Sequence, residues 1–184
     1  MYEFMNNFYE MFSNEDAFCT ATKEQINQLK NLWGNNIYKI TELYEKYQPN
    51  NIPMLESYVK LLGIDSIIDE NTIVEPGKYL SQFGVFVFAL TVGGNLLCID
   101  TNKHHDGDAC VLIVDSNFCS YNEIHDCIEI GIVPDDFIID YSQGNIIKLN
   151  YDNICKYIHK VEDSFILFMS KLSRNEYDDI EDFL

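Results

Sequence analysis

Three consecutive apolar runs between residues 84 and 115 constrain the fold of this chain more than any other feature. The first two runs, 84–92 and 95–100, are rich in β-branched and aromatic residues, and Gly93-Gly94 between them is typical of a tight hairpin turn. The third run, 110–115, follows the turn-like pair Asp106-Gly107. All three are apolar at successive positions rather than alternating. We therefore expect an antiparallel sheet with both faces covered, one of them by helices.

Helical periodicity precedes these runs. A capping box that begins at Thr22, together with apolar residues at helical spacing, predicts a helix over 23–33. Stripes of the same period predict two more helices, over 37–47 and over 53–62, the last one closed by Gly63. The N-terminal third is therefore expected to be helical.

The C-terminal half gives weaker signals until its last element. Alternation over 128–132 predicts a strand, and 137–141 with 146–149 predicts a second hairpin. An apolar stripe from 154 to 172 predicts a final helix, which Asp163-Ser164 can divide into a short turn and a main helix.

The length and the hydrophobic fraction of 47 % predict one domain, residues 1–184, that folds without disulfides. Its expected class is α+β, with an antiparallel sheet of about four to six strands on which N-terminal helices and a C-terminal helix pack. Residues 1–20 hold scattered aromatics that can form a docked arm or short helix. Residues 175–184 hold five acids and no base, and are expected to be a frayed tail.

Charge and composition exclude several classes of function. The chain carries 30 acidic and 12 basic side chains, a formal net charge of −18, which opposes binding to phosphate backbones and argues against direct nucleic-acid binding. No apolar run approaches the ~18 residues of a membrane helix, and the first twelve residues do not resemble a secretory leader. We expect a cytoplasmic protein whose six cysteines, none in a CxxC pair, are reduced and mostly buried, with Cys98 packed in the sheet.

Two clusters hold residue types that carry chemistry. Residues 104–108, His-His-Asp-Gly-Asp, are the densest group of potential metal ligands, but neighbours on one loop do not converge on an ion as a zinc site requires. Residues 125–127, His-Asp-Cys, follow one another in the chain, and successive strand residues point to opposite faces. No glycine-rich nucleotide motif is present. We therefore expect no enzyme, no metal site and no cofactor.

The strongest long-range feature is an acidic run. No Lys or Arg lies between Lys103 and Lys148, whereas nine acids do, which is half of the net charge. Such a run is either a solvated face or a surface that meets a basic partner. The candidate partner-binding residues are Asp106, Asp108, Asp115, Glu123, Asp126, Glu129, Asp135 and Asp136.

The order of these elements and two short motifs resemble the SUKH superfamily, which includes bacterial immunity proteins and a fungal cell-wall synthesis regulator. The stretch from Val92 to Asp100, Val-Gly-Gly-Asn-Leu-Leu-Cys-Ile-Asp, is similar to the family's glycine-rich turn and following strand. Ser164-Phe165 stands where the family's last helix opens with Ser-Phe. The resemblance spans about 22–173, but the family's Leu-Pro-x-x-Tyr motif before the second helix is absent and 116–150 is longer than the family pattern.

The resemblance implies a non-enzymatic protein that binds and neutralises a cognate toxin. Because such toxins commonly have basic nucleic-acid-binding sites, the resemblance favours the acidic run as the surface that meets the partner. The alternative is a regulatory scaffold that binds host proteins in cell-envelope or stress pathways.

Overall fold

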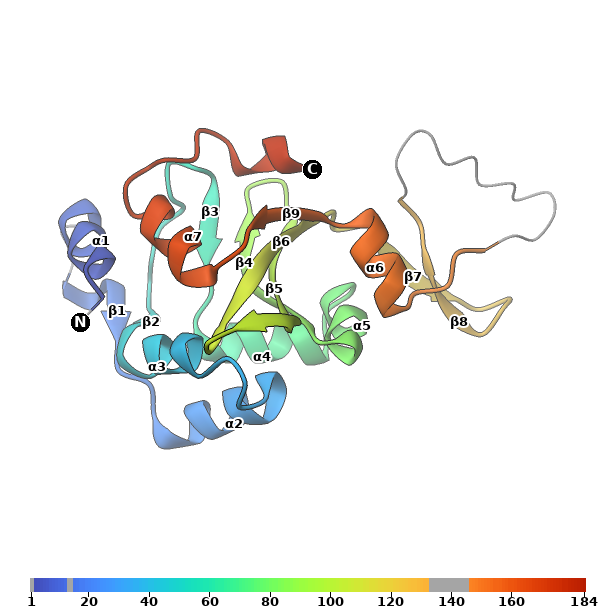
Figure 1. Ribbon diagram of the computed structural model, residues 1–184, viewed down its shortest axis with the longest axis horizontal. Helices are drawn as coiled ribbons and strands as arrows, with labels where there is room; N and C mark the ends of the chain where they lie inside the picture. The colour runs from blue at the N-terminus through green and yellow to red at the C-terminus, as the bar shows by residue number, and fades with distance from the viewer. Residues whose placement is uncertain (1, 13–14, 133–145) are drawn as a thin grey trace.

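The computed structural model describes residues 2–12, 15–132 and 146–184. Its centre is a five-stranded antiparallel sheet of order β3-β4-β5-β6-β9 (Figure 1). These strands are β3 (Val59–Leu61), β4 (Val85–Thr91), β5 (Leu96–His105), β6 (Asp108–Val114) and β9 (His159–Glu162). Two small ladders pair β1 (Phe18–Cys19) with β2 (Gln48–Pro49), and β7 (Cys119–Asn122) with β8 (Cys127–Ile130).

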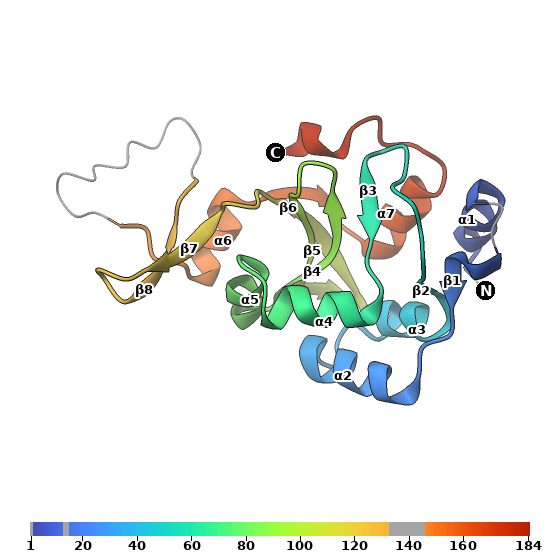
Figure 2. The same cartoon turned by 180° about the vertical axis from the view of Figure 1, so that it is seen from behind.

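Helices surround the sheet, and the predicted α+β class is confirmed (Figures 1 and 2). The α-helices are α1 (Phe4–Phe12), α2 (Lys23–Trp33), α3 (Tyr38–Tyr47), α4 (Ile64–Thr72), α5 (Gly77–Leu80), α6 (Tyr151–Tyr157) and α7 (Phe165–Leu172). Short 3-10 turns are η1 (Glu15–Ala17), η2 (Ser81–Phe83) and η4 (Ile180–Phe183). Helices α3 and α7 contact β6, helices α4 and α5 contact β4, and α2 lies against α3 and α4. Within the described part of the chain, no helix is both long and apolar enough to cross a bilayer.

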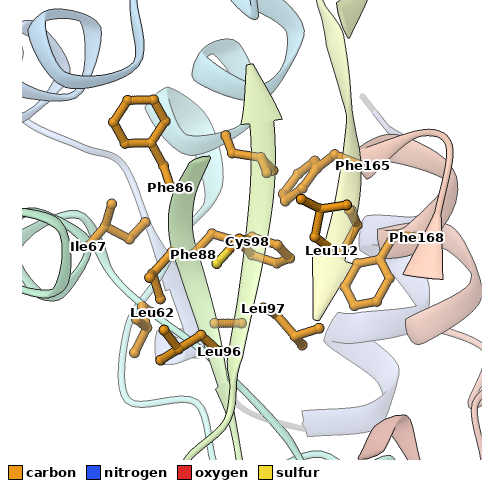
Figure 3. Close-up of a cluster of buried hydrophobic side chains, with 14 of the residues drawn as sticks. Leu62, Ile67, Phe86, Phe88, Leu96, Leu97, Cys98, Leu112, Phe165 and Phe168 are labelled. Carbon is orange, nitrogen blue, oxygen red and sulfur yellow. The ribbon is translucent and has the colours of Figure 1, made fainter. Parts of the chain in front are cut away.

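The central hairpin forms as its sequence predicts. Strands β4 and β5 pair in antiparallel register, and Gly94 closes the turn with the positive φ of +84° that glycine adopts without strain. Phe88 of β4 lies edge-on to Phe165 and Phe168 of α7, at ring-centroid distances of 5.0 and 5.7 Å (Figure 3). Cys98 of β5 is fully buried in the same core, as predicted.

Helix α4 is bonded directly to the sheet. Strand β3 has only three residues, so it leaves the backbone of Val87 in β4 without a strand partner on that side. The buried Asn71 side chain of α4 fills this place, because its Oδ1 accepts from Val87 N at 2.8 Å and its Nδ2 donates to Val87 O at 2.9 Å. An amide that meets both backbone groups of one residue replaces the missing ladder bonds.

The helix predicted over 53–62 is wrong. The chain forms strand β3 there, and Gly63, expected to end a helix, instead precedes α4 as its N-cap. Val59 and Leu61 are buried and Lys60 between them is exposed, which is the period of a strand rather than of a helix. Pairing with β4 decides the outcome, since β4 otherwise has an open edge.

The single apolar stripe over 154–172 also divides differently from the prediction. Helix α6 ends at Tyr157, and 159–162 form the edge strand β9, which pairs with β6. The predicted break at Asp163-Ser164 is confirmed, because Ser164 is the N-cap of α7 and its Oγ accepts from Leu167 N at 2.9 Å. The stripe is shared by α6 and α7, which both have buried residues, and by β9, whose Val161 is half-buried against the core.

The predicted strand over 128–132 corresponds to β8. Residues 146–149 pair with β8, since Ile130 N donates to Ile147 O at 2.8 Å and Leu149 N donates to Ile128 O at 2.9 Å. The other half of the predicted second hairpin, 137–141, lies outside the described residues.

Both ends of the described chain are docked. At the N-terminus, where the sequence leaves a docked arm or a short helix open, the chain forms the helix α1, whose Phe8 is fully buried against Phe18. The frayed C-terminal tail is wrong, because Ile180 is fully buried and anchors η4. Glu181 accepts hydrogen bonds at the β4–β5 turn from Thr91, from Gly93 N at 3.1 Å and from Asn95 Nδ2 at 2.9 Å, and the bond from Thr91 is the main cause that lowers its pKa.

Candidate protein-binding surface

The structure divides the acidic run between the two ends of β6. This strand has seven residues, so its ends lie roughly 20 Å apart at about 3.3 Å per residue. Asp106 and Asp108 lie at its start, whereas Asp115 follows its end and leads into the β7–β8 hairpin. The hairpin carries the remaining described candidates, Glu123, Asp126 and Glu129, and Asp135 and Asp136 lie outside the described residues.

Asp106 fastens the β5–β6 turn to α3. Its Oδ2 lies 2.6 Å from Lys39 Nζ, and its Oδ1 accepts from the Tyr38 hydroxyl at 3.0 Å. Gly107 beside it has a φ of +78°, and a Cβ at that position would lie 2.3 Å from the Tyr38 ring. The hydrogen bond from Lys39 is the main cause that lowers the pKa of Asp106. This carboxylate is therefore met by a cation of its own chain.

Asp108 accepts hydrogen bonds at the N-terminus of α7. Its Oδ1 accepts from Phe165 N at 3.0 Å, and its Oδ2 accepts from the Ser164 hydroxyl. A carboxylate at this position satisfies backbone donors that a helix leaves unpaired, and it interacts favourably with the helix dipole. Asp108 thus joins the β5–β6 hairpin to the last helix.

Replacing Asp108 by alanine is expected to lower the free energy of unfolding by about 2–3 kcal/mol, because charge-assisted hydrogen bonds to a helix terminus are lost. The matched control is Glu123→Ala, which removes an exposed acid from the same acidic run and should cost less than about 0.5 kcal/mol. Urea denaturation measures both. Equal stabilities of the two variants would show that Asp108 has no structural role.

The β7–β8 hairpin projects from the body of the protein (Figures 1 and 2). Its turn is ordered by Asn122, whose Oδ1 accepts from Ile124 N at 2.9 Å and from His125 N at 3.1 Å. The Tyr121 hydroxyl donates across the turn to Asp126, a bond that is the main cause raising the pKa of Tyr121. These contacts place Ile124 at the tip with 88 % of its surface exposed, more than any other large apolar side chain among the described residues.

The surroundings of this apolar tip are acidic. Glu123 and Asp126 are exposed beside it, and Glu129 accepts from Asn122 Nδ2 at 2.7 Å. The base of the hairpin is anchored, because Cys119 and Ile130 are buried and β8 also pairs with 146–149. The hairpin is thus a preformed protrusion with an exposed isoleucine in a negative field. Sequence reasoning found the charge but missed Ile124 and Tyr121, whose exposure depends on the hairpin.

The structure also places the predicted metal-ligand cluster and the six cysteines. His104 and His105 lie on the exposed end of β5, and the described residues contain no group of three or more His, Cys, Asp or Glu that could hold a metal ion. All six cysteines are free thiols. Three of the six are buried, which is fewer than the predicted majority.

A polar cavity of about 660 Å³ lies between 48–53 and the start of α4. Gln48 Nε2 donates to Gln25 Oε1 at 3.2 Å, and Gln48 Oε1 accepts from Ile64 N at 3.3 Å. Gln25 Nε2 in turn donates to Asp65 at 3.0 Å. Because the N-cap of α4 is a glycine without a capping side chain, these amides serve the helix start. The hydrogen bonds of Gln25 and Gln48 at the start of α4 therefore explain why this cavity has a polar lining.

Comparison with known proteins adds no family assignment to this geometry. No protein-family model matches the chain, and no curated protein matches it.

Proposed function

We propose that this chain is a non-enzymatic, SUKH-type immunity protein that binds a cognate toxin and masks its basic, nuclease-like active region. One observation carries the proposal. The β7–β8 hairpin holds the exposed Ile124 at its tip in a stretch of sequence that has nine acids and no Lys or Arg. The motif resemblance supplies the class of partner, and the hairpin supplies the surface.

The expected mechanism has two stages. First, the negative field of the hairpin attracts a basic surface and raises the rate of encounter. Second, the exposed Ile124 and Tyr121 are buried in the contact, where a few central apolar and aromatic side chains provide most of the binding energy. Because the bonds of Asn122 order the tip before binding, little conformational entropy is lost on association.

The test uses the purified chain and the product of the gene adjacent to its own, which the proposal expects to be the toxin. We expect a 1:1 complex with a Kd below about 1 μM by calorimetry, and inhibition of the toxin's activity at equimolar protein. Failure to bind at about 10 μM of each protein would contradict the proposal. If a pulldown with the purified chain recovers host cell-envelope or stress proteins instead, this result would support the regulatory scaffold and contradict the immunity function.

A further inference from the structure

Strand β3 is an edge of the central sheet, and part of its main chain faces away from β4. Leu62 N donates to Phe88 O of β4 at 3.1 Å, and Tyr58 O accepts from the chain after β4 at 3.0 Å. In an antiparallel pair, residues alternate between those that bond to the neighbouring strand and those that do not. The N–H and C=O of Leu61, which precedes Leu62, therefore point to the open side of β3.

These two groups of Leu61 are available to a further strand. Leu61 is only 3 % exposed, yet among the described residues no hydrogen bond reaches its N–H or C=O from the open side. The other outward carbonyl of β3 is occupied, because Val59 O accepts from Leu55 N at 2.8 Å. Main-chain groups of a buried residue require partners, and those of an edge strand can pair with another extended chain.

Leu61 lines the polar cavity of about 660 Å³ described above, which is a cleft beside β3. The segment that follows β2 forms the opposite wall and runs alongside β3 (Figure 2). Asn51 and Ile52 lie in this wall, and their backbone groups also make no hydrogen bond with the described part of the chain. The volume is within the range of about 300–1,000 Å³ for ligand sites. The three residues of β3 span roughly 10 Å, the length of three extended residues of a ligand.

The side chains of the cleft favour an uncharged ligand. Gln25 and Gln48 bond to each other, and Gln48 also bonds to the start of α4. Lys60 and Asp65 contribute one charge of each sign to the lining. The buried Ile52 adds an apolar surface. Recognition therefore depends on main-chain hydrogen bonds and on small apolar side chains rather than on charge.

We propose that the cleft beside β3 binds an uncharged, extended peptide segment of a partner protein, which extends the five-stranded sheet by one strand. Leu61 N–H donates to a carbonyl of the peptide, and Leu61 C=O accepts from one of its N–H groups. Alternate side chains of the peptide enter the cleft, as in other cases of strand addition. This site is distinct from the β7–β8 hairpin and does not depend on toxin binding.

The test titrates the blocked peptide Ac-Thr-Val-Thr-Val-Thr-NH2 into isotope-labelled protein and follows amide resonances by NMR. The peptide has no charge, a high strand propensity and valines at alternate positions. We expect saturable shifts of the Leu61 amide with a Kd below about 1 mM, and exchange of this amide with solvent slowed at least about fivefold. The amide of Lys60 faces β4 and is the internal control, whose exchange rate should not change.

Two comparisons isolate the main-chain bonds. The analogue of the peptide that is N-methylated at every residue cannot donate them and should bind at least about tenfold more weakly. Leu61→Pro removes the outward N–H without removing a bond to β4, and should weaken binding of the original peptide by a similar factor. The matched control Leu61→Ala truncates the same side chain but keeps the N–H, and should bind within about threefold of the wild type.

The proposal is overturned if the peptide and its N-methylated analogue bind equally well, or if about 2 mM peptide gives no saturable shift at Leu61. Both measurements use the wild-type protein, so they decide the question even if a thermal melt shows Leu61→Pro to be unfolded. The affinity should also be the same at about 0.05 and 0.5 M salt, because the ligand is uncharged. Binding at the acidic hairpin would instead weaken with salt.

Discussion

Replacing Phe165 by alanine is expected to lower the free energy of unfolding by about 3–5 kcal/mol. Phe165 is fully buried at the first position of α7, and its ring lies 5.0 Å from that of Phe88 in β4 and 6.4 Å from that of Tyr44 in α3. Its loss leaves a cavity where the last helix, the sheet and an N-terminal helix meet (Figure 3). Urea denaturation measures the change.

The control is Leu167→Ala on the same helix. Leu167 has 41 % of its surface exposed, so this variant should cost less than about 1 kcal/mol. If Phe165→Ala is no more destabilising than Leu167→Ala, the core described for α7 is wrong.

Elements with local signals could be predicted from the sequence, and edge strands could not. The capping box at Thr22 and the Gly93-Gly94 turn act over a few residues, and both are present as predicted. Strands β3 and β9 have three and four residues, too few for a clear period. Each forms because a central strand needs a partner, a requirement that depends on residues far away in the chain.

The candidate site follows the same rule, because the contacts of its acidic residues are made with residues that are distant in the sequence. The sequence counts the acids but does not show which cations or donors meet them. Lys39, which pairs with Asp106, is 67 residues away, and Ser164, which bonds to Asp108, is 56 residues away. The folded structure shows that Asp106 and Asp108 bind other elements of the chain, whereas Glu123 and Asp126 lie beside the exposed Ile124.

The double change Glu123→Lys with Ile124→Ser is expected to weaken toxin binding at least tenfold, about 1.4 kcal/mol. The first change places a cation opposite a basic surface, and the second removes the apolar side chain that would be buried at the centre of the contact. Both side chains are exposed in the free protein, so folding stability should be unchanged within about 1 kcal/mol. Calorimetry against the toxin domain measures the affinity.

The matched control is Glu45→Lys with Met54→Ser. It makes the same kind of charge reversal and apolar truncation at exposed positions on α3 and before β3, on the side away from the β7–β8 hairpin (Figure 1). This variant should bind within about twofold of the wild type. If both double variants weaken binding equally, net charge rather than the hairpin governs recognition.

The most direct test of binding through the acidic hairpin is the association rate constant with the toxin domain as a function of ionic strength. Between about 0.05 and 0.5 M salt, the wild-type rate should fall at least tenfold, because screening shortens the reach of the hairpin's field. The variant Glu123→Lys with Ile124→Ser should associate more slowly at low salt and depend less steeply on it. A wild-type rate that is indifferent to salt, and equal to that of this variant, would contradict the account.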